Sequence, residues 1–339
     1  MHKGKETIHR VGVIGCRGVG ALHASGVEGG DGNAELAAGC DLSEALLAEF
    51  EERFGERWPG LATYTDHRKM LAGAELDIVT VATSDHLHAD LVVDAAEAGV
   101  KGIFCEKPMA TNIADADRML EAVARHNTIL SIDHTRRFQP LWRHTKERVD
   151  QGTIGEVQYI VGTLSGPRSM LFRNGTHLID AICYFAAGEP EWVMAELEDG
   201  YGDYSEYRGD GGHDPASEPG ANGYIRFDNG VRGFYVGGTK KTAIARMVLE
   251  IAGTTGNIII DTDRAEIHRP DEAVERIDPP SWDVEGIAAG VQELIRLVDE
   301  GGGLPVSSGR DGMRAVEVLI GFLQSQQRDN AKVRLPLPR

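Results

Sequence analysis

The fold of this chain is constrained most by the alternation of short apolar runs with helical patterns over its first 135 residues. In the helical stretches apolar residues return every three or four positions, as Leu87, Leu91 and Ala95 do before Gly99. The runs have the length and β-branched content of buried strands and cover residues 9–15, 34–40, 75–83, 100–106 and 128–134. This alternation is typical of right-handed crossovers and a parallel sheet covered on both faces. Residues 1–135 are therefore predicted to form an α/β, doubly wound Rossmann domain.

The rest of the chain follows a different pattern. After residue 136, short alternating runs predominate, and Asn229-Gly230 stands between two of them. Asn-Gly suits the positive φ angles of a tight hairpin, so neighbouring runs are expected to pair antiparallel. Helical patterns complete this half at 138–150, 284–300 and 308–327. Residues 136–339 are predicted to form an α+β domain with a large, mainly antiparallel open sheet, and the last helix is expected to pack back on the first domain.

One segment of the second half is rich in acids and glycine. Residues 199–220 contain few apolar side chains, so they are expected to form a mobile surface loop. A calcium site is the sharper interpretation, but the acids lack the spacing of an EF-hand loop.

The first strand runs directly into glycines at "GCRGVG", residues 15–20, and a helical pattern follows. A dinucleotide fingerprint G-x-G-x-x-G that starts at Gly15 would place its second glycine where Arg17 stands. Here that glycine comes one position later, at Gly18, and Gly20 keeps the last place. The strand–turn–helix context lets backbone N–H groups face a pyrophosphate. We therefore expect a working loop made of Gly15, Arg17, Gly18, Val19 and Gly20.

An acidic residue ends the second strand, as the fingerprint also requires. Asp41 is placed to bond the ribose hydroxyls of the adenosine. Its carboxylate would repel a 2′-phosphate, and the following Leu42 and Ser43 supply no cation. NAD is therefore the expected cofactor.

Composition excludes several classes of partner. Lys and Arg number 35 against 53 Asp and Glu, a net charge of −18 that disfavours nucleic acid and anionic membranes. Apolar runs are too short for a membrane span, and the first strand begins near Ile8, which leaves no room for a signal peptide. The four cysteines, Cys16, Cys40, Cys105 and Cys183, form no C-x-x-C pair and are expected to be reduced, as in a cytoplasmic protein. The first three lie at or just past the ends of apolar runs and are expected to be small buried residues.

Several longer segments resemble the Gfo/Idh/MocA oxidoreductases, the family of glucose-fructose oxidoreductase and inositol dehydrogenase. The most specific is Glu106-Lys107-Pro108, directly after the apolar run "GIFC". Four other segments occur in the family's order and carry the resemblance over nearly the whole chain: residues 81–99, 133–140, 152–157 and 174–180.

The resemblance implies a first domain that binds NAD and a second that binds substrate and makes dimers or tetramers through its sheet. It implies that Lys107 is the catalytic lysine and that His177 exchanges a proton with the substrate hydroxyl, while Asp180 supports the helix carrying His177. It also implies that Thr83, His88, Glu106 and Lys107 line the cofactor.

The chemistry of these residue types fits the implied reaction. Hydride removal from an alcohol needs a base for the hydroxyl proton, and a nearby ammonium stabilises charge on the oxygen. The alternatives are a strand-end surface lysine for Lys107 and a capping or core histidine for His177. His86 and His88 form an H-x-H pair, but no third ligand is apparent, and no metal is expected.

The chain departs from the family at one position. Many sugar dehydrogenases of the family have Asp four residues before the histidine, and here that position is Arg173. Its planar fork suits a carboxylate, so a sugar acid is one hypothesis, and a solvent-facing Arg173 is the alternative. The expected substrate-binding residues are Lys107, Arg137, Arg173, Asn174 and His177.

Three functions are compatible with these residues. The first is an NAD-dependent dehydrogenase of a secondary hydroxyl on a sugar, sugar acid or cyclic polyol. The second is a glycosidase or lyase-type enzyme that oxidises its substrate transiently and regenerates NAD. The third is a non-catalytic sugar or NAD sensor, which retention of Lys107 and His177 disfavours.

Overall fold

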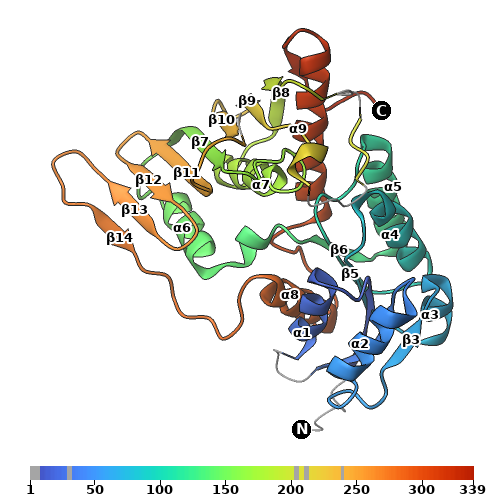
Figure 1. Ribbon diagram of the computed structural model, residues 1–339. Helices are drawn as coiled ribbons and strands as arrows, with labels where there is room; N and C mark the ends of the chain where they lie inside the picture. The colour runs from blue at the N-terminus through green and yellow to red at the C-terminus, as the bar shows by residue number, and fades with distance from the viewer. Residues whose placement is uncertain (1–7, 29–32, 202–205, 210–213, 238–239) are drawn as a thin grey trace. The chain divides into compact units, whose positions relative to one another are not determined.

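The computed structural model describes residues 8–28, 33–201, 206–209, 214–237 and 240–339 (Figure 1). The chain divides into two compact units. Unit 1 comprises Met1–Ala110, Asp115–Phe138 and Asp283–Arg310, and unit 2 comprises Thr111–Ala114, Gln139–Trp282 and Asp311–Arg339. The units alternate along the chain, and the single domain boundary expected at 135/136 stays a prediction.

Unit 1 contains a six-stranded parallel sheet in the order β3-β2-β1-β4-β5-β6. The predicted Rossmann fold is confirmed, and the five predicted runs each contain a strand. The strands are β1 (His9–Ile14), β2 (Ala34–Cys40), β4 (Ile78–Val81), β5 (Gly102–Cys105) and β6 (Ile129–Ile132). A further short strand, β3 (Ala62–Tyr64), was not predicted, because its three half-buried residues give no periodic signal.

Helices complete unit 1. They are α1 (Val19–Val27), α2 (Glu44–Phe54), α3 (His67–Gly73), α4 (His88–Glu97), α8 (Ile287–Asp299) and, from residue 115 on, α5 (Ile113–His126). The late helix α8 packs tightly on α1 and β5. A Cβ atom on Gly26 would lie 3.1 Å from Val291, and one on Gly102 would lie 2.8 Å from Val298. Glycine at these positions therefore allows α8 to approach both helix α1 and strand β5 closely.

Unit 2 contains a nine-stranded sheet in the order β14-β13-β12-β11-β7-β10-β9-β8-β15. Among the strands that the structure describes here, β7 and β10 pair parallel and the other neighbours pair antiparallel, so the predicted mainly antiparallel sheet is confirmed. Asn229-Gly230 forms the predicted hairpin turn between β9 and β10, with Gly230 at φ 92°. The strands are β7 (Val157–Ser165), β8 (Pro190–Leu197), β9 (Ala221–Phe227), β10 (Arg232–Gly237), β11 (Arg246–Gly253), β12 (Asn257–Ile260), β13 (Ala265–His268), β14 (Glu275–Ile277) and β15 (Val333–Arg334).

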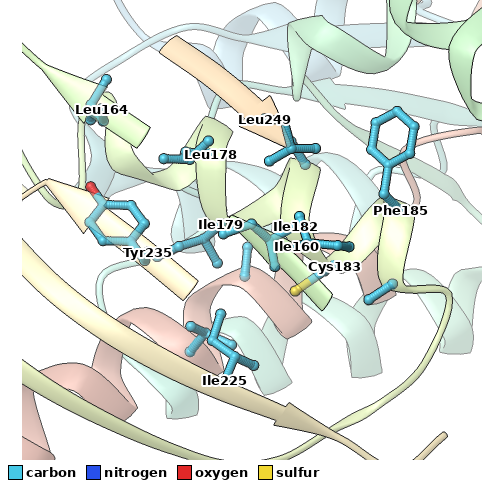
Figure 2. Close-up of a cluster of buried hydrophobic side chains, with 14 of the residues drawn as sticks. Ile160, Leu164, Leu178, Ile179, Ile182, Cys183, Phe185, Ile225, Tyr235 and Leu249 are labelled. Carbon is cyan, nitrogen blue, oxygen red and sulfur yellow. The ribbon is translucent and has the colours of Figure 1, made fainter. Parts of the chain in front are cut away.

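Three long helices belong wholly or almost wholly to unit 2: α6 (Pro140–Asp150), α7 (Gly175–Ala186) and α9 (Gly309–Gln327). Figure 2 shows apolar side chains of α7 among those of the sheet. Glycines in the strands let the helices approach: a Cβ on Gly162 would lie 2.9 Å from Ile182, and one on Gly223 would lie 2.2 Å from the Phe322 ring. The core of unit 2 therefore lies between one face of the sheet and α7 and α9.

The opposite face of this sheet carries an aromatic stripe, formed by Tyr159, Trp192, Tyr224 and Phe234. The Trp192 and Tyr224 rings stack with centroids 4.9 Å apart, and Phe234 makes edge contacts with Tyr224 and Tyr159. Met194 and Val236 beside the stripe are about two-fifths exposed, at 40% and 42%. Within the described ranges, the helices are too short or too polar to cross a membrane.

Candidate cofactor and active site

The glycine loop lies between β1 and α1 of unit 1, as predicted. Gly15 has φ 89°, and a Cβ atom there would lie 2.4 Å from the carbonyl oxygen of Ala82. A Cβ on Gly20 would lie 1.6 Å from the carbonyl oxygen of Gly15. Both positions therefore require glycine, because a side chain would collide with backbone that cannot move aside.

The displaced glycine, Gly18, precedes the first residue of α1. It has φ 55°, nothing lies within 4 Å of a Cβ placed there, and no side chain caps the helix. Arg17, Gly18 and Val19 are exposed. An uncapped helix N-terminus behind a glycine turn offers N–H groups and a favourable dipole to an anion. These residues fit the pyrophosphate of a dinucleotide, although the fingerprint is irregular.

Asp41 follows β2 and stabilises the glycine loop through hydrogen bonds. Its Oδ2 accepts a hydrogen bond from the Cys16 N–H and its Oδ1 accepts one from the Ser43 N–H, both at 3.0 Å. A carboxylate has about four acceptor sites, so two remain for ribose hydroxyls. Asp41 thus positions the loop, and its contact with the ribose stays a prediction.

His88 and Thr83 lie after β4. His88 is fully buried, with Nδ1 3.0 Å from the carbonyl oxygen of Pro108 and Nε2 3.3 Å from that of Thr83. The imidazole therefore connects the end of β4 to the turn containing Lys107. His88 therefore has a structural role in holding these two segments together. Direct contact of His88 or Thr83 with a cofactor stays a prediction.

Glu106 and Lys107 follow β5 directly. The Glu106 N–H donates to the carbonyl oxygen of Val81 (2.9 Å), and Glu106 Oε2 accepts the Lys107 N–H (3.3 Å). Because β1, β4 and β5 are neighbours, the glycine loop, Thr83 and Lys107 lie along the carboxyl edge of one sheet. This edge is where open α/β sheets bind ligands.

Two residues beside Glu106 were not predicted. His23 on α1 has Nε2 3.4 Å from Glu106 Oε1, and Asp133 follows β6. Burial alone would raise the pKa of Glu106, but the His23 hydrogen bond and the Lys107 charge outweigh it and hold this pKa well below its ordinary range. These contacts favour the ionised form of Glu106. The sequence offered one indication of the role of His23, which is a polar residue on the otherwise apolar helix that follows the glycine loop.

In unit 2, the expected substrate residues lie at the start of α7. His177 is half-buried, whereas both of its neighbours, Thr176 and Leu178, are buried. The Asn174 amide donates to the carbonyl oxygen of Arg168 at 2.6 Å. Asp180 is buried on the same helix, which is compatible with its expected support of α7.

Glu218, which was not predicted, holds the segment before α7. Its Oε2 accepts the N–H groups of Phe172 (2.7 Å) and Arg173 (3.0 Å), and the carbonyl oxygen of Pro219 accepts that of Leu171 (2.9 Å). Glu218 itself is only 5% exposed. One carboxylate oxygen therefore fixes the backbone of Arg173.

The acidic segment 199–220 was expected to be a mobile surface loop. For its described residues this was wrong in part, because Tyr207 stacks on Phe172 with ring centroids 3.8 Å apart and Glu218 is buried. Lys240 also holds the segment, because its ammonium donates hydrogen bonds to the Tyr201 hydroxyl and to the carbonyl oxygen of Glu218. Residues 202–205 and 210–213 lie outside the described part of the chain.

Arg137 belongs to unit 1. It is buried, and its guanidinium donates to the carbonyl oxygen of Val306 at 2.7 Å. This bond gives Arg137 a role in fixing backbone, and a role in substrate binding stays a prediction.

Two sequence models of one family match the chain. Residues 9–134 match an oxidoreductase family with an NAD-binding Rossmann fold, and residues 142–259 match the GFO/IDH/MocA C-terminal domain. A myo-inositol 2-dehydrogenase of Thermotoga maritima is 37% identical over 147 residues, 43% of this chain and 42% of that protein. This match therefore spans less than half of the relative's length.

Two further relatives cover nearly the whole chain. An inositol 2-dehydrogenase of Rhizobium meliloti is 25% identical over 340 residues, 93% of this chain and 96% of that protein. The solved structure of levoglucosan dehydrogenase in complex with NADH has a TM-score of 0.83 and 21% identity, covering 98% of this chain and 100% of that one. At this identity the likeness concerns the fold alone.

Proposed function

Because the chain belongs to the GFO/IDH/MocA oxidoreductase family, we propose that it is an NAD-dependent dehydrogenase of a sugar, sugar acid or cyclic polyol. The observation that carries the proposal is the carboxyl edge of the unit 1 sheet, where a glycine cradle, Asp41 and the Lys107 turn occur together. NAD, when bound, would supply a nicotinamide that can accept a hydride from the carbon bearing a secondary hydroxyl.

The chain's own groups would handle the oxygen and its proton. We assign Lys107 to the oxygen, where its ammonium would stabilise developing negative charge. We assign His177 to the hydroxyl proton, which a neutral imidazole nitrogen can accept. Its partial exposure within an otherwise buried turn of α7 supports this assignment.

Arg173 is the basis of a narrower hypothesis about the substrate. Its backbone is fixed by Glu218, so its side chain starts from a defined point four residues before His177 in the chain. A guanidinium binds a carboxylate through two parallel hydrogen bonds. A uronic or aldonic acid would then be preferred over neutral sugars, with Asn174 as a further polar contact.

Association and location are also proposals. The aromatic stripe on the unit 2 sheet is the kind of apolar surface that a second copy of the chain would cover, so we expect a homodimer or homotetramer. All four cysteines are described, and no disulfide joins any of them. Burial raises the pKa of Cys16 to about 12, which keeps this thiol unreactive in the glycine loop. These thiols are compatible with the cytoplasm.

The activity is tested by mixing the protein with NAD and a panel of polyols, neutral sugars, sugar acids and glycosides while the absorbance of NADH is recorded. Lys107→Met and His177→Gln are expected to lower kcat with the best substrate by about a hundredfold or more, with NADH affinity retained for His177→Gln. Lys69→Met and His144→Gln are matched controls on α3 and α6.

Other outcomes identify the alternatives. Release of an aglycone from a glycoside without net NADH would indicate transient oxidation, and binding of NAD and sugar without turnover would indicate a sensor. For the sugar-acid hypothesis, Arg173→Ala should reduce kcat/KM for acids far more than for neutral sugars. Equal losses for both classes would refute it.

A further inference from the structure

A buried cluster adjoins the turn that carries Lys107. It consists of His23 on α1, Glu106 after β5 and Asp133 after β6, and we call it the acid cluster. One ligand atom from each residue lies within 4.8 Å of the other two. The three residues are 0%, 9% and 0% exposed. Two carboxyl groups and an imidazole are therefore concentrated where water cannot screen them.

Two carboxylates this close in a buried site repel one another, and the single charge of Lys107 can offset only one of the two negative charges. The hydrogen bonds distinguish them. Glu106 has two donors, the His23 Nε2–H and the Lys107 N–H, one for each oxygen. Asp133 Oδ1 accepts the Thr135 hydroxyl at 3.0 Å. Asp133 Oδ2 lies 4.0 Å from His23 Nε2, and Asp133 also shares a side-chain hydrogen bond with Glu106.

We propose that Asp133 is a protonated carboxylic acid in the folded protein and positions the ionised Glu106 carboxylate that fixes the Lys107 turn. Asp133 is thus a positioning residue, which acts through Glu106. Only the catalytic consequence of this inference rests on the proposed dehydrogenase activity. The protonation state of Asp133 is a property of the folded unit 1.

The surroundings of the cluster agree with a neutral Asp133. Burial, the negative charge of Glu106 and the hydrogen bond with Glu106 raise the pKa of Asp133, while the Thr135 hydrogen bond and the charge of Lys107 act in the opposite direction. Cys105 at the end of β5 is fully buried and its thiol pKa is raised, so it stays neutral and adds no charge to the cluster. The adjacent His134 makes a hydrogen bond to Ser307 Oγ at 3.2 Å.

The position of Glu106 explains why its neighbour's charge matters. Oε1 is held by a helix that begins at the glycine loop, and Oε2 holds the backbone N–H of Lys107. A second negative charge on Asp133 would repel Glu106 and loosen both bonds. A proton on Asp133 removes that repulsion without changing the packing.

The protonation state is measured by infrared difference spectroscopy of the whole protein at neutral pH. The wild type is expected to show the C=O band of a protonated carboxylic acid, with a shift in D₂O, and Asp133→Asn to lack it. Asp85→Asn is the matched control and should retain the band. This measurement requires no substrate and no turnover.

Kinetics test the positioning role. Asn mimics the neutral acid in size and shape, so Asp133→Asn should retain kcat/KM within about threefold, whereas Asp133→Ala should lower it about tenfold or more because Glu106 loses its support. Equal losses in the two variants would overturn the positioning role.

Two other results would overturn the proposal: absence of the band in the wild type, and a stoichiometric metal ion found by mass spectrometry in protein purified without added metal. A bound cation would take the place of the proton. A protein that shows the band but turns over none of the sugars would instead refute the dehydrogenase activity and leave the state of Asp133 established.

Discussion

The glycine loop of unit 1 and the segment before α7 in unit 2 both present backbone close to expected ligand positions, but they are held differently. In the loop, Gly15 and Gly20 are packed against backbone carbonyls at distances that leave no space for any side chain. In the segment before α7, one oxygen of Glu218, some 45 residues away, accepts two backbone N–H groups. The conformation of the glycine loop depends on the lack of side chains at Gly15 and Gly20, whereas that of the segment before α7 depends on the carboxylate of Glu218. Substitutions should therefore affect the two regions in different ways.

The largest expected effect is from Gly20→Ala. The new methyl group would lie 1.6 Å from the carbonyl oxygen of Gly15, so α1 must move away from the end of β1. We expect a loss of about 3 kcal/mol in the free energy of unfolding and at least about tenfold weaker NADH binding. Urea unfolding and NADH fluorescence titration measure both. Gly60→Ala is the control, because nothing lies within 4 Å of a Cβ there. Equal effects at both positions would contradict the requirement for glycine at position 20.

The next effect is from Glu218→Ala. It leaves the N–H groups of Phe172 and Arg173 without their acceptor, which should cost about 2–4 kcal/mol of stability. The substrate KM should rise while the Kd of NADH stays constant, because the change lies in unit 2. Glu218→Gln keeps one acceptor oxygen and should recover part of the loss.

Asp228→Ala is the control for Glu218, since Asp228 accepts a single N–H, that of Glu189, at an exposed site. If Glu218→Ala weakened NADH binding as much as substrate binding, the separation between the two regions would be wrong.

The pH dependence of stability should reveal the acid cluster. The pKa of Glu106 is lowered from 4.5, so its contribution to stability is present above that pH and is lost as the pH falls further. The pKa of Asp133 is raised from 3.8, so its contribution is present below that pH and is lost as the pH rises through the raised value. In urea unfolding from pH 3 to 8, Glu106→Gln should remove part of the acid loss. An unchanged profile in this variant would contradict an ionised Glu106.

The smallest effect is expected from Arg17→Gly, which restores the regular glycine. Arg17 is exposed, and an exposed cation contributes modestly to phosphate binding, so NADH affinity should fall no more than about fivefold. The loss should shrink at high salt if Arg17 reaches a phosphate. An unchanged NADH affinity would exclude a contact between Arg17 and a phosphate, but it would not argue against cofactor binding by the glycine loop.

The sequence allowed the Rossmann sheet, the glycine loop, Asp41 and the Lys107 turn to be predicted, because each depends on neighbouring residues or on strand order. His23, Asp133 and Glu218 could not be recognised in this way. Asp133 and Glu106 meet only because β5 and β6 are adjacent in the sheet. Glu218 is one of several acids in its segment, and only the folded chain brings it to the N–H groups of Phe172 and Arg173.

The place of α8 in unit 1 has a consequence for synthesis on the ribosome. Residues Asp283–Arg310 complete unit 1, and α8 covers α1 and β5, which are made much earlier. The nucleotide-binding part therefore cannot close its core until most of the chain has left the exit tunnel. Until then its apolar surface stays exposed to chaperones, and a chain truncated near residue 135 should aggregate rather than form an independent NAD-binding domain.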